Sequence, residues 1–119
     1  REWMICLGRG FDFLHMPNLA LIVGPYSPQL SEPIATAADI IAKNMASGRI
    51  PDDGFLLLAS SPFEEIGSDR ARAEMKARFM ANFASTVIRE RHPGIAGGMV
   101  VQAAVLDWHT RRLEKFDRE

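Results

Sequence analysis

The chain has 119 residues, 47% hydrophobic and 24% charged, a balance typical of one globular domain over residues 1–119. Lysine and arginine number 14 against 15 acidic residues, and the resulting net charge of −1 argues against a nucleic-acid partner. No apolar run approaches the roughly 18 residues of a membrane helix, so no membrane partner is expected. One cysteine excludes a disulfide within the chain and favours a reducing, cytoplasmic location. Because the first residue is Arg1 and not methionine, the sequence leaves open a preceding segment.

Two short apolar segments near the start of the chain predict buried strands. Glu2–Leu7 is followed by Gly8 and Gly10, and Leu19–Val23 stops at Gly24. The second segment is apolar at successive positions. This pattern indicates a strand that is covered on both faces, as in a parallel sheet packed between helices.

A helix and a third strand follow. The helix is predicted to begin at Ser31, a good N-cap residue, and to stop at Gly48. Its apolar residues recur at spacings that place them on one face, namely Ile34, Ala38, Ile41 and Met45. The strand is predicted at Phe55–Ala59, which is uniformly apolar.

The longest helix is predicted from about Asp69 to Arg91, with Ser68 as its N-cap. Apolar residues four positions apart indicate a broad buried stripe of Met75, Phe79, Phe83 and Val87, widened by Met80, Ala84 and Ile88. The charged residues between them are then expected to form the solvated face of this helix.

Two strands close the chain. Met99–Trp108 is apolar, His109–Arg111 is expected to turn the chain, and Arg112–Phe116 returns as a charged edge strand. The alternation of strands and helices predicts an α/β fold. We expect an open, mostly parallel sheet of four to five strands with crossover helices and an antiparallel C-terminal edge strand.

Neither a metal site nor a cofactor is expected. The potential ligands Cys6, His15, His92 and His109 are scattered, and only Asp107 with His109 forms a closely spaced pair. A catalytic zinc needs three protein ligands at one point. The chain also lacks a Walker A motif, a dinucleotide-binding glycine motif and a G-x-S-x-G nucleophile elbow.

The strand ends are the best candidate for a ligand site, because ligands of open α/β sheets bind beyond the carboxyl ends of parallel strands. Three segments with small or polar residues lie there: Gly8–Gly10, Gly24–Ser27 and Ser60–Pro62. The ligand-binding residues predicted from them are Arg9, Gly24, Tyr26, Ser27, Ser60 and Ser61. A small anion is the expected ligand, since a guanidinium binds anions in fork geometry. The alternative interpretation is three ordinary strand exits.

The order of elements resembles the β-class carbonic anhydrases over nearly all of residues 3–116. The stretches "NLALIVGPY" and "DDGFLLLASSP" occupy the places of that family's second and third strands. The stretch "VVQAAVLDWHTRRLEKF" is similar to its closing hairpin. The resemblance implies a homo-oligomer, namely a dimer formed by pairing of sheets.

The zinc motifs of that family are incomplete in this chain. The family binds zinc through Cys-x-Asp-x-Arg after the first strand and His-x-x-Cys after the third. The corresponding segments here are Cys6–Gly10 (CLGRG), without the aspartate, and Ser60–Phe63 (SSPF), without histidine or cysteine. Two of three protein ligands are missing, so carbon dioxide hydration by the family route is not expected.

Three functions from different classes remain open. The preferred hypothesis is a carbonic-anhydrase-like domain without a zinc site, a non-catalytic binding, regulatory or assembly subunit. The alternative is a small-molecule enzyme or anion-binding protein with a strand-end pocket around Arg9, Tyr26 and Ser60. Its acid–base candidates are Asp12 and His15. A third hypothesis is a pure interaction module that uses exposed Trp3, Trp108 and Phe116.

Overall fold

The computed structural model describes residues 12–16, 18–23, 29, 31–50, 53–60, 70–107 and 112–116. Along the chain these residues form β1 (Asp12–Met16), β2 (Leu19–Val23), α1 (Ser31–Ala46), β3 (Gly54–Ser60), α2 (Arg70–Arg91), the short 3₁₀ helix η2 (Ala96–Gly98), β4 (Met99–Asp107) and β5 (Arg112–Phe116). The predicted strand over residues 2–7 lies outside the described residues.

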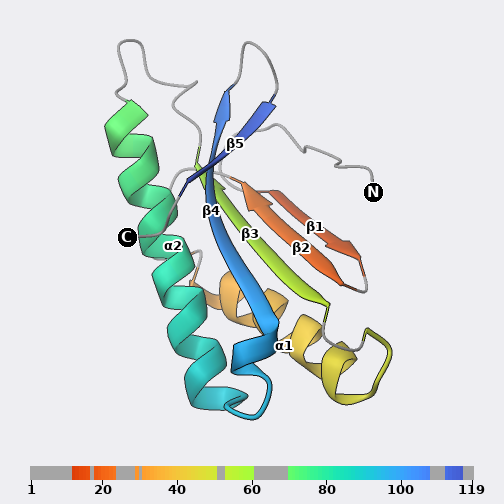
Figure 1. Cartoon of the computed structure of the whole chain (residues 1–119). Helices are drawn as coiled ribbons and strands as arrows, with labels where there is room; N and C mark the ends of the chain where they lie inside the picture. Colours follow the sequence, from red (N-terminus) through yellow and green to blue (C-terminus); the bar gives the residue numbers. More distant parts are fainter. Residues whose placement is uncertain are drawn as a thin grey trace.

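The strands form one open sheet in the order β1-β2-β3-β4-β5 (Figure 1). The three central strands are parallel, whereas β1 and β5 pair antiparallel with their neighbours. Helices α1 and α2 make the two crossovers between the central strands. The α/β class, the open sheet, the crossover helices and the antiparallel C-terminal edge strand are therefore confirmed.

The edge strand β1 is a described strand that the sequence did not predict. It reads DFLHM and pairs with β2 in a tight hairpin, in which Met16 lies opposite Leu19. The turn is tied to β3, because the Phe55 amide donates to the Asn18 carbonyl oxygen at 2.8 Å. Asn18 Nδ2 also donates to Asp53 Oδ2 at 2.8 Å. Pairing with β2 determines this element, and the short sequence DFLHM does not predict it alone.

Both helices cover the same face of the sheet. Their buried side chains share one core cluster with the sheet residues Ala20, Ile22, Leu56, Leu58 and Ala103. The chain moves from β2 to β3 to β4 in one direction, and right-handed crossovers then place successive helices on one side. The sequence had suggested helices on both sides of the sheet.

The opposite face of the sheet is apolar and buried as well. Its cluster contains Leu21, Leu57, Ala59, Ala104 and Leu106, and no described helix contributes to it. All four of the residues from Leu19 to Ile22 are at most 1% exposed. The expectation that β2 is covered on both faces is thus confirmed.

Helix α1 follows the sequence pattern closely. Ile34, Ala38 and Ile41 are completely buried, and Met45 packs at the edge of the same cluster. Gly48 ends the helix with a positive φ of 78°, and its amide donates to the Met45 carbonyl oxygen at 3.1 Å. Glycine suits this position because other residues pay a steric cost in the left-handed region.

Helix α2 buries one part of the predicted stripe and leaves the other part exposed. Met80, Ala84, Val87 and Ile88 are buried as predicted. Met75, Phe79 and Phe83 are 48%, 54% and 36% exposed, so these three are not core residues. Ala73, Ala77 and Ala81 complete the buried face in their place. Small side chains let the helix approach the sheet and α1 closely, where phenylalanines would not fit.

Ion pairs fasten both ends of α2. At its start the Arg70 guanidinium donates to Glu74 Oε2 at 3.0 Å and to the carboxylate of Glu114 in β5. The hydrogen bond to Glu114, and then that to Glu74, raises the pKa of Arg70 above its usual value. At the other end Asp39 of α1 accepts from Arg91 Nη1 at 3.1 Å. The pairs link α2 to β5 and to α1.

Candidate functional site

The carboxyl ends of the three parallel strands meet at one edge of the sheet. This edge contains the ends of β2 at Val23 and of β3 at Ser60, and β1 begins there with Asp12 opposite Val23. Adjacent strands lie about 4.8 Å apart, so the backbone of Asp12 is roughly 10 Å from β3. The backbone therefore brings two of the predicted site residues, Asp12 and Ser60, to the same edge.

The second acid–base candidate lies deeper in the sheet. His15 is opposite Ala20, three residues along β1 from Asp12, or about 10 Å at the rise of an extended strand. Asp12 thus fits a site at the carboxyl edge better than His15 does. The remaining predicted residues lie outside the described part of the chain and stay predictions: Arg9, Gly24, Tyr26, Ser27 and Ser61.

Of the metal-ligand candidates, His92 is the one whose side chain is described. Its Nε2 lies 2.8 Å from Asp39 Oδ1, and both side chains are about three-quarters buried. Arg91 shares the same carboxylate, so the group forms a bridge between α1 and α2. Within the described ranges, no three histidine, cysteine or acidic residues come together in a way that could hold a metal ion.

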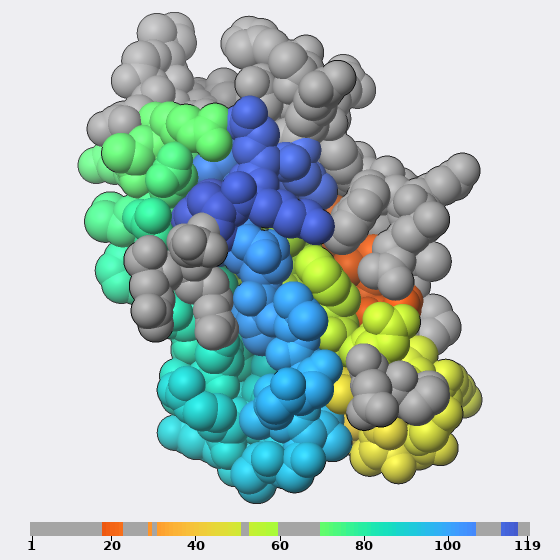
Figure 2. All heavy atoms as spheres, viewed as in Figure 1, coloured from red at the N-terminus to blue at the C-terminus, as the bar shows by residue number. Residues whose placement is uncertain are grey.

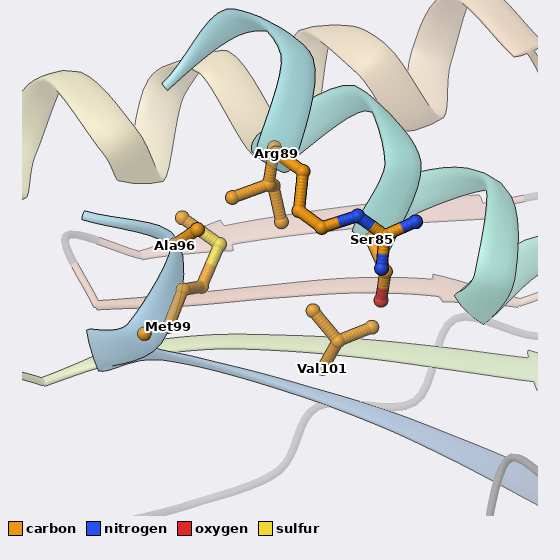
Figure 3. A pocket seen from close by; sticks show the side chains of 7 residues that line it. Ser85, Arg89, Ala96, Met99 and Val101 are labelled. Atoms are coloured by element: carbon orange, nitrogen blue, oxygen red, sulfur yellow. The ribbon is translucent and has the colours of Figure 1, made fainter. Parts of the chain in front are cut away.

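A pocket of about 300 Å³ lies at the opposite end of the sheet, between α2, η2 and the start of β4 (Figure 3). Ile88, Met99 and Val101 supply apolar walls, while Ser85 and Arg89 supply a hydroxyl and a guanidinium. Neither polar side chain is buried, so few groups would fix the orientation of a ligand. Sequence analysis missed this pocket, since its lining is spread over two distant segments.

The largest exposed apolar feature among the described residues is on α2. We define the α2 stripe as Met75, Phe79 and Phe83, which lie four residues apart and therefore form one line along the helix. In the space-filling view α2 forms one side of the molecule (Figure 2). Sequence analysis found these three residues by their spacing but assigned them to the core.

Phe116, a candidate of the interaction-module hypothesis, is not an exposed anchor. It is half-buried at the margin of the core cluster beneath the helices. The guanidinium carbon of Arg78 lies 5.0 Å from its ring centroid, within the range of a cation–π contact. The other two candidates, Trp3 and Trp108, lie outside the described residues.

Comparison of the chain with known proteins identifies no relative. No family model matches the chain, and neither a curated protein nor a solved structure matches it. No helix in the described part of the chain has the length and apolar character needed to cross a membrane. The basis for a function is therefore the chemistry of this chain's own residues.

Proposed function

We propose that the chain is a non-catalytic binding and assembly module that docks through the α2 stripe. The carrying observation is the exposure of Met75, Phe79 and Phe83, between 36% and 54%, on a helix whose core face is complete without them. Scattered apolar residues are common on protein surfaces, but three large side chains aligned on one helix form a contiguous patch. Such a patch is typical of a protein–protein contact.

The incomplete zinc motifs support the non-catalytic part of this proposal. If the resemblance to β-class carbonic anhydrases reflects descent, the segments Cys6–Gly10 and Ser60–Phe63 have lost two of three ligands. A zinc-bound water acid enough to attack carbon dioxide needs that ligand set. Loss of the zinc ligands would end catalysis but would leave the outer surface of the domain available for binding a partner.

Replacing both Phe79 and Phe83 by glutamine tests whether the stripe belongs to a docking surface or to the fold. We expect the free energy of unfolding of the monomer to change by less than about 1 kcal/mol, because exposed side chains lose little packing. The measurement is urea unfolding at several protein concentrations, extrapolated to the monomer so that any association is removed.

The matched control is Met80→Gln, which places the same polar side chain on the buried face of the same helix. Met80 is fully buried, so this change should lower the free energy of unfolding by more than about 2 kcal/mol. A comparable loss in the Phe79/Phe83 double variant would show that the stripe is covered in the folded monomer, and the docking function would be wrong.

A second candidate function is supported by the backbone positions of Asp12 and Ser60 at the same edge of the sheet. In this proposal Arg9 clamps a small anion there, as the sequence suggests. Arg9→Ala should leave the melting temperature of the unliganded protein nearly unchanged but abolish the stabilisation by the anion. Thermal-shift measurements with bicarbonate, phosphate, carboxylates and nucleotides on both proteins test this. A mutant destabilised by ~1–3 kcal/mol, with no anion stabilising the wild type, would make Arg9 a structural residue.

A further inference from the structure

We propose that the chain binds an extended peptide, which adds to the outer edge of β4 as a further strand beside α2. An apolar side chain of the peptide enters the pocket between α2 and β4, and a carboxylate of the peptide pairs with Arg89. None of the residues that line this pocket belongs to the α2 stripe. The inference therefore goes beyond the proposed function and does not depend on it.

The argument begins with the length of β4, which exceeds that of the strand on its outer side. Pairing with β5 extends from Asp107 back to Ala103, whereas β4 begins at Met99. Among the residues that the structure describes, the outer edge of residues 99–102 thus has no partner strand, and we call this segment the open edge. Figure 1 shows β5 beside only the upper part of β4. Because alternate residues of a strand direct their N–H and C=O groups to the same edge, the open edge offers main-chain donors and acceptors.

The open edge lacks the features that usually protect an edge strand from pairing. Its sequence, Met-Val-Val-Gln, contains no charge and no proline, and lysine and proline are residues that discourage pairing at an edge. Val100 is 49% exposed, although valine favours a paired strand. The Gln102 side chain donates to the carbonyl oxygen of Phe116, where the pairing with β5 ends. This combination is typical of an edge to which an extended peptide adds.

The pocket of about 300 Å³ lies directly beside the open edge, on the sheet face that the helices cover. Met99 and Val101 belong to the open edge and also line the pocket. Side chains of an added strand that point to this face would lie next to Val101, at the usual cross-strand spacing. Because Ile88 and these two residues form apolar walls, an apolar side chain fits there. The open edge then supplies the orienting hydrogen bonds that the side chains of the pocket do not.

Arg89 determines the charge that the peptide must carry. Its side chain extends back along α2 toward Ser85, with Val101 on the sheet side of the pocket (Figure 3). The side chain is exposed, and its Nη2 donates to Thr86 Oγ1 at a long 3.4 Å. A guanidinium has five N–H donors, so this contact leaves donors for a carboxylate. No acidic residue lines the pocket, and the adjacent Glu90 is not among its lining residues.

An extended peptide is the ligand that uses all three features. A small anion would pair with Arg89 but would leave the strand edge and the apolar walls unused. An apolar small molecule would fill the pocket without using either the guanidinium or the main-chain groups. Antiparallel addition, in line with β5, is the expected direction, because parallel pairing is less stable per residue.

Titration of the ¹⁵N-labelled chain with short peptides, followed by nuclear magnetic resonance of the backbone amides, tests the proposal. The probe is acetylated and amidated Thr-Leu-Thr-Glu-Thr, in which leucine and glutamate point to the same face of an extended strand. The reversed peptide, Thr-Glu-Thr-Leu-Thr, supplies the same two side chains in the other order. We expect at least one of them to shift the amide signals of residues 99–101, with a dissociation constant below about 1 mM.

Changes in the better peptide separate the contribution of the strand edge from that of the pocket. N-methylation of alternate amides keeps every side chain but removes the N–H donors, and one of the two alternating sets should abolish binding. Asparagine in place of leucine should raise the dissociation constant about tenfold, because a polar amide would face the apolar walls. N-methylated peptides that both bind like the parent would contradict strand addition.

A charge exchange tests the role of Arg89. Arg89→Glu should raise the dissociation constant of the glutamate peptide about tenfold and should make the chain prefer the same peptide with lysine in place of glutamate. Arg89 is exposed, so the fold should be unaffected. The matched control is Arg49→Glu, an exposed position after α1, which should leave the dissociation constant unchanged. An Arg89→Glu variant that still prefers the glutamate peptide would show that Arg89 does not bind the carboxylate.

Three results would overturn the peptide site. One is the absence of any shift with either peptide at about 2 mM. Another is a set of shifts confined to the α2 stripe, which would support the proposed function but not this inference. The third is protection of the outward N–H groups of the open edge from hydrogen exchange in the peptide-free chain. Such protection at low protein concentration would mean that another segment of this chain covers the edge, and protection that appears only at high concentration would identify a second copy as the occupant.

Discussion

Leu58→Ala should lower the free energy of unfolding by about 2–5 kcal/mol. Leu58 is completely buried in the middle of β3, between Ile22 of β2 and Ala103 of β4 on the sheet face that both helices cover. Truncation removes its transfer free energy and leaves a cavity that the flanking strands can close only in part. Since domains of this size are stable by about 5–15 kcal/mol, the loss should appear as a much lower urea midpoint.

Two matched variants make this result specific. Leu57→Ala changes the neighbouring residue on the opposite face, where Leu57 is also completely buried, and should cost a similar amount. Val100→Ala truncates a side chain that is 49% exposed and should cost less than about 1 kcal/mol. A mild Leu57→Ala beside a severe Leu58→Ala would show that the second face of the sheet is not buried in solution.

The apolar strands could be predicted from the sequence because their signal is local. Leu19–Val23 has the predicted bounds, as does the charged edge strand Arg112–Phe116. The predicted strand Phe55–Ala59 is one residue longer at each end in the structure, and Met99–Trp108 is one residue shorter at its end. Continuous apolar runs bounded by glycine, proline or polar residues have few alternatives to a buried strand. The strand order then follows, because sequential parallel strands with helical crossovers tend to be neighbours.

Helix α2 shows where a local signal stops being informative. Its sequence contains two apolar faces, one with Phe79 and Phe83 and one built mainly from alanines. Periodicity identifies the helix and part of its buried face, but the large side chains of Phe79 and Phe83 extend the predicted stripe to the wrong side. The alanines on the other side are buried in their place, because they let the helix pack closely against the sheet and α1.

The candidate sites also differ in whether local sequence or tertiary packing determines them. The place of Ser60 at the carboxyl edge could be predicted, because the direction of a parallel strand determines it. The place of Asp12 could not, because β1, the strand to which it belongs, was not predicted. The pocket beside Arg89 and the exposed stripe depend on how α2 is rotated about its axis. A prediction that places Met75, Phe79 and Phe83 in the core therefore misses the exposed surface that we propose to be functional.

The rotation of α2 can be tested directly by placing one carboxylate on either side of the helix. Ala81→Asp puts a charge at a completely buried position that contacts the core between α2 and the sheet. An unpaired buried carboxylate costs at least about 3–5 kcal/mol, so we expect this variant to be largely unfolded. The measurement is far-ultraviolet circular dichroism with urea unfolding.

Asn82→Asp is the matched control, since it adds the same charge one residue later on the exposed side. It should change the free energy of unfolding by less than about 0.5 kcal/mol. If the helix instead buried Met75, Phe79 and Phe83, the side around Ala81 would face water, and Ala81→Asp would be tolerated. A folded Ala81→Asp variant would therefore reject the observed rotation of α2, and with it the exposure on which the docking surface depends.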